Sequence, residues 1–246
     1  MQDNVIELRD VTFGFGTHII FNGLSLSFTR GTFTVIVGGS GEGLSTLLKL
    51  AYGIYNPRSG SVTIEGIDTV RSPKADIMKM KSRNGFVFQD DALFSSRTAY
   101  QNLAMHRKYN TNMSDAEIEK EIIEHVARFG LTKDRIITAR PNVLSGRERR
   151  FVNYLRSIIH SPEILFLDSV FDGIDQQADA LIRNEICRYV TSGIPITVLA
   201  VCNKVSEFAF LAARVIAFKD HVPCFDGSYE EFKKRAEADE YLAEFK

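Results

Sequence analysis

Several features that would assign a chain to a specialised class are scarce or missing here. The sequence holds three cysteines (Cys187, Cys202 and Cys224), which lie far apart without metal-ligand spacing. We therefore expect reduced core thiols and no structural metal. No stretch approaches the roughly 20 apolar residues of a bilayer-spanning helix, and the first ten residues have no signal-peptide core. We expect a cytoplasmic protein whose membrane role, if it has one, comes through a partner chain.

An excess of charge of either sign is also missing. The formal net charge is -1, so the composition does not favour nucleic acid as a partner. Internal repeats and low-complexity segments are absent from the sequence as well. A chain of 246 residues with 44% hydrophobic composition can bury a substantial core. We expect a single domain, 1–246, with an inserted subdomain.

The first fifty residues predict two kinds of strand and a helix. Residues 4–15 and 19–28 alternate between apolar and polar side chains around a short Gly-Thr-His turn, which predicts an antiparallel hairpin. Residues 31–38 form the continuous apolar run of a buried parallel strand, and residues 44–54 have helical spacing. Strand, glycine-rich turn and helix therefore follow one another in the order that a phosphate-binding loop requires.

Beyond this loop the sequence alternates between strand and helix patterns. From about residue 100 to residue 140 the pattern is helical, and the spacing of Ser114 and Glu117 predicts a capping box. One apolar face follows, which we interpret as core: Ile118, Ile122, Ile123, Val126 and Phe129. Further strands are expected within 56–68, 84–90, 163–168 and 195–203, and a mixed-charge helix, solvated or partner-facing, within 228–245.

The turn before the first helix resembles a phosphate loop with one residue wrong. The stretch VGGSGEGLST (37–46) follows the pattern Gly, four residues, Gly, Lys, Ser or Thr, except that Leu44 replaces the lysine. Backbone N–H groups at a helix start can hold phosphate oxygens without side-chain charge. Asp168 ends an apolar strand, where its carboxylate would meet a Mg²⁺ that the Ser45 hydroxyl also holds.

Five ordered motifs resemble those of the ATP-binding cassette (ABC) ATPases along nearly the full length. VGGSGEGLST resembles the Walker A loop, FVFQD the Q-loop, LSGRE the signature, ILFLD Walker B and GID the D-loop. The resemblance implies an α/β P-loop NTPase fold of ABC type. A RecA-like parallel sheet would form its core, with an N-terminal antiparallel β-subdomain, an inserted α-helical subdomain at about 95–155 and a C-terminal helical tail at about 228–246. Residues 89–104 and the short tail are most similar to the ATPases of Mla/Mce-type phospholipid transporters.

The resemblance also implies Mg-ATP as the cofactor and names the residues that would meet it. Phe15 falls where the family stacks an aromatic ring on adenine. The candidate nucleotide-binding residues are Phe15, Gly38, Gly39, Ser40, Gly41, Gly43, Ser45, Thr46 and Gln89; the signature residues are Leu144, Ser145, Gly146, Arg147 and Glu148; the D-loop residue is Asp175; and the magnesium ligands are Ser45, Gln89 and Asp168.

The departures from the family fall on the residues that do its chemistry. Leu44 replaces a lysine that pairs with the terminal phosphates, and such a pair at about 4 Å and an effective dielectric of ~20 is worth on the order of 4 kcal/mol. Ser169 stands where a catalytic glutamate polarises water, a role worth about 10² to 10⁴ in rate. Asn203 replaces the switch histidine and cannot become a cation.

Two further departures change charge, while other motif residues remain. Glu42 adds a negative charge to the phosphate loop, and Arg147 replaces the second signature glycine, where its guanidinium could meet phosphate. Glycines that we expect to be needed for backbone geometry remain at positions 38, 43 and 146. We therefore predict a folded cassette that does not hydrolyse ATP, and the lost residues also weaken the expectation that Mg-ATP binds.

Three functions remain open at this point. The first is a pseudo-ATPase subunit at the cytoplasmic face of the inner membrane. It would pair head to tail with a second cassette, possibly a catalytically intact paralogue whose site it completes through residues 144–146, and a transmembrane permease would contact its Q-loop region. The second is an active or ATP-binding-only ATPase in which Lys49 replaces the lysine, although it should point away from the loop. The third is a scaffold or regulatory module outside transport.

Overall fold

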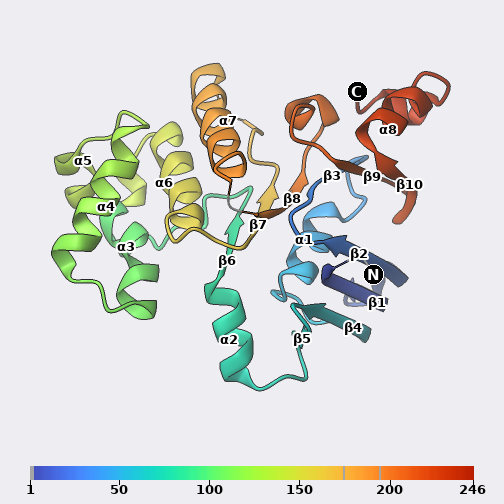
Figure 1. The fold of residues 1–246 in the computed structure, drawn as a ribbon, viewed down its shortest axis with the longest axis horizontal. Coiled ribbons are helices and arrows are strands. Elements are labelled where there is room, and N and C mark those ends of the chain that lie inside the picture. The colour runs from blue at the N-terminus through green and yellow to red at the C-terminus, as the bar shows by residue number, and fades with distance from the viewer. Residues whose placement is uncertain (1–2, 174, 194) are drawn as a thin grey trace. The chain divides into compact units, whose positions relative to one another are not determined.

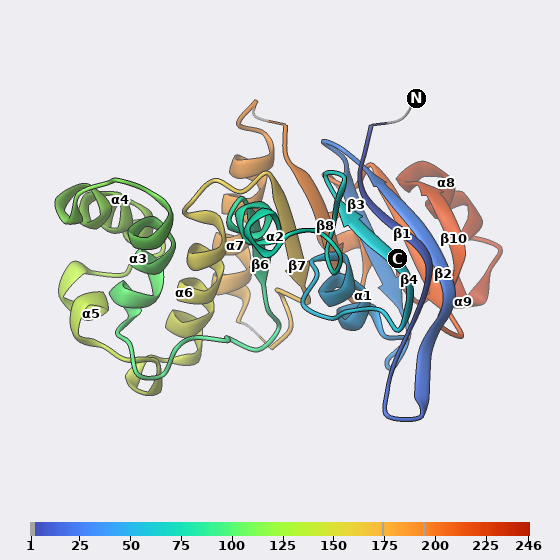
Figure 2. The same cartoon turned by 90° about the horizontal axis from the view of Figure 1, so that it is seen from below.

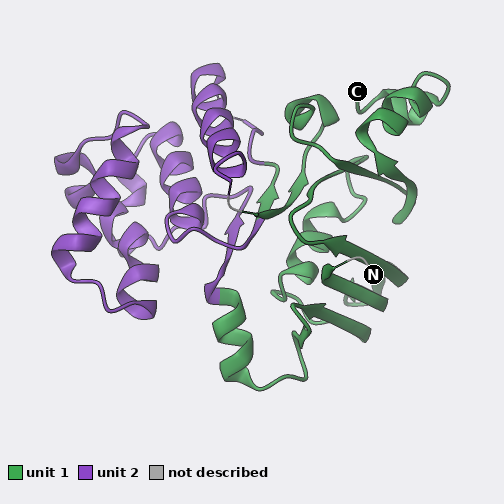
Figure 3. Ribbon diagram, viewed as in Figure 1, with its two compact units in different colours: residues 1–81, 166–169, 195–246 green, residues 82–165, 170–194 purple. Residues whose placement is uncertain are grey.

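The computed structural model describes residues 3–173, 175–193 and 195–246. The chain divides into two compact units, which are coloured separately in Figure 3 and are described one at a time here. The first unit comprises Met1–Lys81, Phe166–Ser169 and Pro195–Lys246, and the second comprises Ser82–Leu165 and Val170–Ile194.

An antiparallel sheet opens the first unit. Its two long strands form the predicted hairpin, which Figure 2 shows as a curved blue pair. Apolar side chains such as Ile6 and Leu8 are fully buried, while the polar residues between and after them are half-buried (Glu7) or exposed (Arg9), as the alternating pattern predicts. The sheet order is β2-β1-β4-β5, with β1 (Asn4–Phe15), β2 (His18–Thr29), β4 (Ser59–Ile64) and β5 (Ile67–Asp68).

A second sheet in the same unit is built around β3, which is buried along its apolar residues. It pairs in parallel with β8 on one side and β9 on the other, in agreement with the predicted parallel core. The antiparallel β9–β10 hairpin was not predicted. Within this unit the order is β10-β9-β3-β8-β7 (Figure 1), with β3 (Phe33–Gly38), β7 (Ile164–Asp168), β8 (Thr197–Val201), β9 (Arg214–Lys219) and β10 (Val222–Ser228).

Helix α1 (Leu44–Ala51) lies between the two sheets of this unit. It contacts β1 and β4 on one side and β3 and β8 on the other. Leu47, Leu48 and Leu50 are fully buried, which explains why the helix is apolar around most of its surface. The loop between β3 and α1 is therefore fixed at both ends by buried elements.

The remaining helices of the first unit correct the expectation of a solvated tail. The tail forms two short helices, and its apolar residues Phe232, Leu242 and Phe245 are buried. They are spaced too unevenly along the chain to form one amphipathic face, so each short helix packs separately. The elements are α2 (Lys74–Ser82), the 3-10 helix η2 (Val205–Phe208), α8 (Tyr229–Arg235) and α9 (Glu240–Ala243).

The second unit is mainly helical. Helix α6 is its central element and contacts β6, α3, α4 and α7. The predicted capping box is present, because the Ser114 hydroxyl accepts from the Glu117 N–H and the Glu117 side chain accepts from the Ser114 N–H. Of the predicted apolar face, only Ile123 is half-exposed. The elements are β6 (Asn84–Val87), α3 (Ala99–Asn110), α4 (Asp115–Ala127), α5 (Lys133–Thr138), the 3-10 helix η1 (Pro141–Val143), α6 (Gly146–Ile158) and α7 (Gln176–Val190).

The cysteines and the helices complete the comparison with the sequence. All three cysteines are free thiols, as expected, but only Cys202 is buried, so the expectation of core thiols was wrong for the exposed Cys224. Within residues 3–173, 175–193 and 195–246, no helix has the length and apolar character needed to cross a bilayer.

Candidate functional site: the phosphate loop and the signature helix

The loop from Gly39 to Gly43 has the backbone of an anion-binding turn. Gly41 (φ +91°) and Gly43 (φ +82°) lie in the left-handed region, and a Cβ on Gly43 would come within 2.5 Å of Ile20 Cγ2. Gly43 is the N-cap of α1, and in the described part of the chain no side chain caps this helix start. The first-turn amides are therefore left to an anion, so the backbone fits a phosphate group.

Ser45 and Asp168 meet as the magnesium ligands of such a site would. The Ser45 hydroxyl donates to Asp168 Oδ1 at 2.7 Å. Ser45 is the second residue of α1, and Asp168, which is 1% exposed, ends β7. Two hard oxygen ligands beside a phosphate-binding turn are suited to Mg²⁺. Both belong to the first unit, and the structure brings them together as expected.

The charges of the loop are arranged differently from the expectation. Leu44 is the first residue of α1 and only 8% exposed, so it supplies packing where the family has a cation. The Glu42 carboxylate accepts hydrogen bonds from the backbone N–H groups of Asp220 at 3.0 Å and His221 at 2.6 Å. Its charge is thus stabilised by backbone N–H groups of the turn between β9 and β10.

Tyr241 of α9 contacts the loop, and no pattern in the sequence predicts this contact. Its hydroxyl accepts a hydrogen bond from the Gly39 N–H at 3.2 Å and donates one to the carbonyl of Phe218. Burial raises the pKa of this phenol, so it stays protonated at neutral pH. Gly39 and Tyr241 are separated by 202 positions in the sequence.

Phe15 lies in an aromatic cluster at the end of β1. Its ring meets Phe13 edge-on at 5.2 Å and Tyr55 edge-on at 5.5 Å, and the side chain is 51% exposed. Phe13 and Tyr55 stack on each other at 5.3 Å and hold the cluster in place. An exposed ring on a fixed base is suited to stacking a planar group.

The positions of the missing base and switch residue lie at the ends of neighbouring strands. Ser169 directly follows β7, with φ +48°, and its N–H donates to the Val201 carbonyl at 3.0 Å. Asn203 lies just beyond β8 and is exposed. Neither side chain can act as a general base at neutral pH, as the sequence indicated.

In the second unit, Gln89 lies in a segment that α6 holds through its side chains. Gln89 Nε2 donates to Asp172 Oδ2 at 3.3 Å, and the Gln89 carbonyl accepts from Arg150. Arg149 donates to Asp91 at 3.0 Å. Arg149 and Arg150 were not singled out from the sequence, although three arginines among residues 147–150 were a visible signal.

The signature residues form the start of α6. The Ser145 hydroxyl accepts from the Glu148 N–H at 3.2 Å, and the Ser145 N–H donates back to Glu148 at 2.7 Å, which makes a capping box. Arg135 donates two hydrogen bonds to Glu148, at 2.8 and 2.9 Å, and these lower the pKa of Glu148 to about 2. Leu144 is buried.

Arg147 is hydrogen-bonded to Asp175, the D-loop residue of the same chain. Its Nε donates to Asp175 Oδ2 at 2.9 Å, and its Nη1 donates to Gln177 at 2.8 Å. The other Asp175 oxygen caps α7, and the Ala178 N–H, followed by Arg147, lowers the pKa of Asp175. Gly146 has ample room, since a Cβ there would lie 3.8 Å from its nearest neighbour, so the expectation that its backbone requires glycine was wrong.

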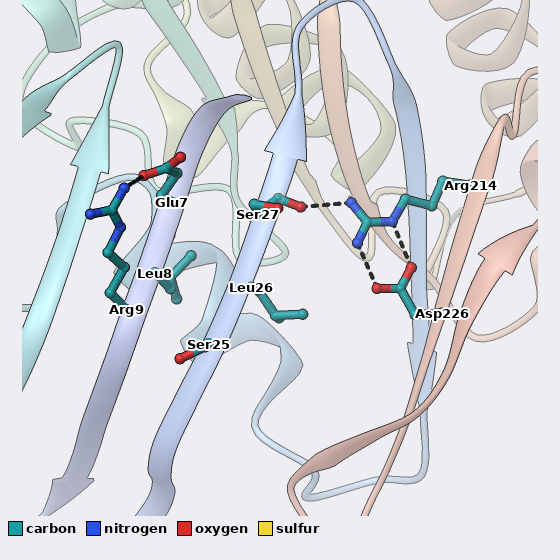
Figure 4. A pocket seen from close by; sticks show the side chains of 8 residues that line it. All are labelled: Glu7, Leu8, Arg9, Ser25, Leu26, Ser27, Arg214 and Asp226. Carbon is teal, nitrogen blue, oxygen red and sulfur yellow. Dashed lines mark hydrogen bonds and ion pairs between the residues drawn. The ribbon is translucent and has the colours of Figure 1, made fainter. Parts of the chain in front are cut away.

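One cavity is lined by the signature residues, and another lies apart from the residues described above. In the second unit, a pocket of about 230 Å³ is lined by Gly146, Arg147, Arg149, Arg150, Gly173, Asp91 and Asp175. In the first unit, a shallow groove of about 340 Å³ lies over β1 and β2, and Figure 4 shows Arg214 at its side. Arg214 binds both Asp226 oxygens at 2.6 Å and the Ser27 carbonyl at 2.6 Å. The Arg214 guanidinium at this groove is therefore already paired within the chain.

Fold and loop together define a P-loop NTPase of ABC type: a parallel core, an antiparallel sheet and a helical unit, with the loop between β3 and α1. The ABC transporter family model matches residues 21–172. The chain belongs to this family. It aligns with the dimeric cassette MJ0796 bound to ADP and Pi at a TM-score of 0.81 and 25% identity, over 91% of this chain and 98% of that one. A bacterial Atm1-family exporter with ATP bound shares the fold, at a TM-score of 0.80 and 23% identity, over 99% of this chain and 41% of that one.

Three curated relatives are similar over most of this chain. The intermembrane phospholipid transport system ATP-binding protein MlaF of Haemophilus influenzae is 28% identical over 94% of this chain and 86% of its own length. The methionine import protein MetN of Brucella abortus is 30% identical over 88% of this chain, and the probable ribonucleotide transport protein mkl of Mycobacterium tuberculosis is 28% identical over 82%. The chain spans little more than half the length of MetN (58%) and mkl (55%).

Proposed function

We propose that this chain is the ATP-binding-cassette subunit of a lipid-trafficking transporter and that its own phosphate loop does not support ATP hydrolysis. The observation that carries the proposal is the state of the loop. Its backbone and the Ser45–Asp168 pair fit a magnesium-bound phosphate, whereas Leu44 places buried apolar surface at the position of the cation. Geometry is kept where it supports binding, and the charge that assists reaction is replaced.

The chemistry that remains is binding. Bound Mg-ATP would bring its own charge to the site, where the loop amides, Ser45 and Asp168 would meet it. Ser169 follows Asp168 without a carboxylate to take a proton from water. An ATP-binding-only cassette is therefore the second candidate function, and the short Ser45–Asp168 contact favours it.

We further propose that the chain pairs head to tail with a second cassette, a catalytically intact paralogue, and that the pair binds a transmembrane permease through residues 89–97. Residues 144–147 would then face the phosphate loop of the partner. The dimeric form of MJ0796 supports this arrangement. The assembly would lie at the cytoplasmic face of the inner membrane. The likeness to MlaF supports phospholipid as the cargo, while the names of MetN and mkl point to other cargoes.

The test of the missing reaction is ATP turnover by the purified chain. We expect the wild type to match Asp168→Asn, because neither contains the base or the cation that hydrolysis needs. Turnover in the wild type that Asp168→Asn abolishes would contradict the proposal, since a contaminating ATPase would be unaffected by that substitution.

The test of the completed site is the composition of the complex isolated from cells. We expect a second cassette with an intact lysine, glutamate and histidine to copurify with this chain and a permease. Recovery of a homodimer with no second cassette would remove the completed-site version.

A further inference from the structure

The segment from Asp239 to Lys246 is packed into the first unit. Asp239 caps α9 by accepting from the Leu242 N–H at 3.2 Å. Leu242 is 2% exposed and Phe245 is 6% exposed, so both side chains are buried. Tyr241 meets Phe245 edge-on at 5.1 Å. These contacts fix α9, which is too short to be stable on its own.

At one end of the segment, the Tyr241 hydroxyl joins two neighbouring strand ends. It bonds the Gly39 N–H and the Phe218 carbonyl, and Phe218 pairs with Gly38 in the parallel β3–β9 ladder. The ammonium of Lys219 lies 4.9 Å from the centre of the Tyr241 ring, which stabilises the orientation of the ring. One side chain therefore fixes the point at which the chain leaves β3 and enters the phosphate loop.

At the other end, the segment accepts hydrogen bonds from Val205 and Ser206, which follow Asn203 closely. The Phe245 carbonyl accepts from the Val205 N–H at 2.7 Å, and the Lys246 oxygen accepts from the Ser206 hydroxyl at 3.2 Å. Val205 begins η2, which packs on β3. The six residues from Tyr241 to Lys246 thus connect the start of the phosphate loop to the segment after β8.

We propose that Tyr241 is a positioning residue that holds the phosphate loop in place without nucleotide, and that Asp239–Lys246, here called the strap, ties this loop to the segment after β8. The buried side chains of Leu242 and Phe245 anchor the strap, and the Tyr241 hydroxyl transmits that anchorage to Gly39. This inference goes beyond the proposed function, because it concerns the loop before any nucleotide arrives. It stands whether or not the site hydrolyses ATP.

A purely structural role for the strap would need only its buried apolar side chains. The hydroxyl of Tyr241 distinguishes the two roles, since Tyr241→Phe keeps the ring, its contact with Phe245 and the stacked Lys219. Only the bonds to Gly39 and Phe218 are lost. Tyr229 provides a matched control, because Lys233 lies 4.8 Å from the centre of its ring and Tyr229→Phe also removes one hydroxyl.

The experiment is amide hydrogen exchange on the full chain, read by NMR at Gly39 and Val205 without nucleotide. We expect Tyr241→Phe to speed exchange at Gly39 by about tenfold, as loss of one structural hydrogen bond predicts, and to shift the Gly39 amide resonance. We expect faster exchange at Val205 as well, because the short strap responds as a unit. Tyr229→Phe should leave both amides as in the wild type.

A second variant ends the chain after Ala238, which should speed exchange at both amides further; if that variant does not fold, Tyr241→Phe decides alone. Unchanged exchange and an unchanged resonance at Gly39 in Tyr241→Phe would overturn the positioning role. Faster exchange at Gly39 with Val205 unaffected would overturn the tie between the two segments. Neither outcome changes the result expected when ATP turnover is compared between the wild type and Asp168→Asn. The proposal for Tyr241 and the proposal that the chain does not hydrolyse ATP can therefore be rejected independently.

Discussion

The phosphate loop and the signature helix satisfy their polar groups in opposite ways. Around the loop, the partners are backbone groups and one phenol: Glu42 accepts from two backbone amides, and Gly39 donates to Tyr241. Around the start of α6, the partners are charged side chains, with Arg147 on Asp175 and Arg149 on Asp91. The phosphate loop thus has Leu44 in place of a cation, whereas the surface proposed to face a partner carries several arginines.

The difference shows how motif side chains can be replaced without loss of the fold. The loop depends on backbone conformation, which Gly41 and Gly43 supply, so replacing a lysine by Leu44 leaves its shape intact. The signature helix depends on a capping box and ion pairs, which tolerate an arginine at position 147. The two regions can therefore be compared by three kinds of substitution. One restores a charge in the loop, one removes a charge from the signature helix, and one adds a methyl group to a glycine of each region.

Restoring the loop cation should give the largest effect. In Leu44→Lys, an ammonium about 4 Å from phosphate is worth about 4 kcal/mol, so Mg-ATP should bind up to about a thousandfold more tightly than to the wild type. Titration calorimetry measures the affinity. Leu44→Met is the matched control, because methionine has an unbranched side chain like that of lysine but carries no charge. Equal affinity in the Lys and Met variants would show that side-chain charge does not limit binding here.

Adding a methyl group to one glycine of each region should change the free energy of unfolding differently, because the two glycines differ in backbone geometry. Gly43→Ala forces a left-handed residue and places a Cβ 2.5 Å from Ile20, so we expect a loss of about 3 kcal/mol in the free energy of unfolding. Gly146→Ala meets no close neighbour and replaces a helical glycine, so its stability should stay constant or rise by up to about 1 kcal/mol. Urea denaturation compares them, and equal losses would contradict the assigned geometry.

Much of the first unit could be predicted because its signals are local. The β1–β2 hairpin follows from alternation, and the loop follows from its glycines and the apolar strand before it. The β9–β10 hairpin carries no such signal, since its turn places Asp220 and His221 at positive φ without the usual glycine. Ser45 and Asp168 are 123 positions apart, and their pairing followed from two local patterns, a phosphate loop and an Asp at the end of an apolar strand.

The residues that could not be predicted are those whose partners are distant in sequence and have no motif. In the sequence, Tyr241 is one aromatic residue in a mixed-charge tail and matches no motif. Its contact with Gly39 is formed only when the chain folds. The bond between Arg147 and Asp175 joins two predicted motifs, yet nothing in either motif indicates that the substituted arginine would turn to its own chain. Motifs predicted the positions, and tertiary packing decided the partners.

Acid should weaken the second unit through two stacked histidines. His106 and His160 lie 4.0 Å apart, and burial, followed by the charge of His106, lowers the pKa of His160 to about 4. Because the folded chain resists protonation, stability is fully present above about pH 6.5 and falls as the pH drops toward 4. The loss is on the order of 3 kcal/mol for His160. Denaturation at pH 7 and pH 5 measures most of it, because the stability that Glu148 contributes falls mainly below pH 4.5, as its pKa is about 2 in the folded chain and 4.5 in the unfolded chain.

A variant separates this source of acid sensitivity from others. His160→Phe keeps a buried ring and removes the titrating group, so its stability should vary less between the two pH values than that of the wild type. His18→Phe, at an exposed position of β2, is the control and should keep the wild-type dependence. An unchanged pH dependence in His160→Phe would assign the loss to other groups.

Removing the signature arginine should give the smallest effect, and it shows how much the ion pair matters. In Arg147→Gly the pKa of Asp175 should rise only part of the way to its ordinary value, because the Ala178 N–H, the larger cause of the lowering, remains. Carboxyl NMR titration measures this.

Arg149→Gln removes a neighbouring charge bonded to Asp91 instead, so it should leave the Asp175 pKa unchanged. Since exposed ion pairs contribute little, the free energy of unfolding should be nearly the same in all three proteins. A large loss in Arg147→Gly would mean that this pair stabilises the start of α7, and the signature helix would then resemble the phosphate loop in depending on its intramolecular bonds.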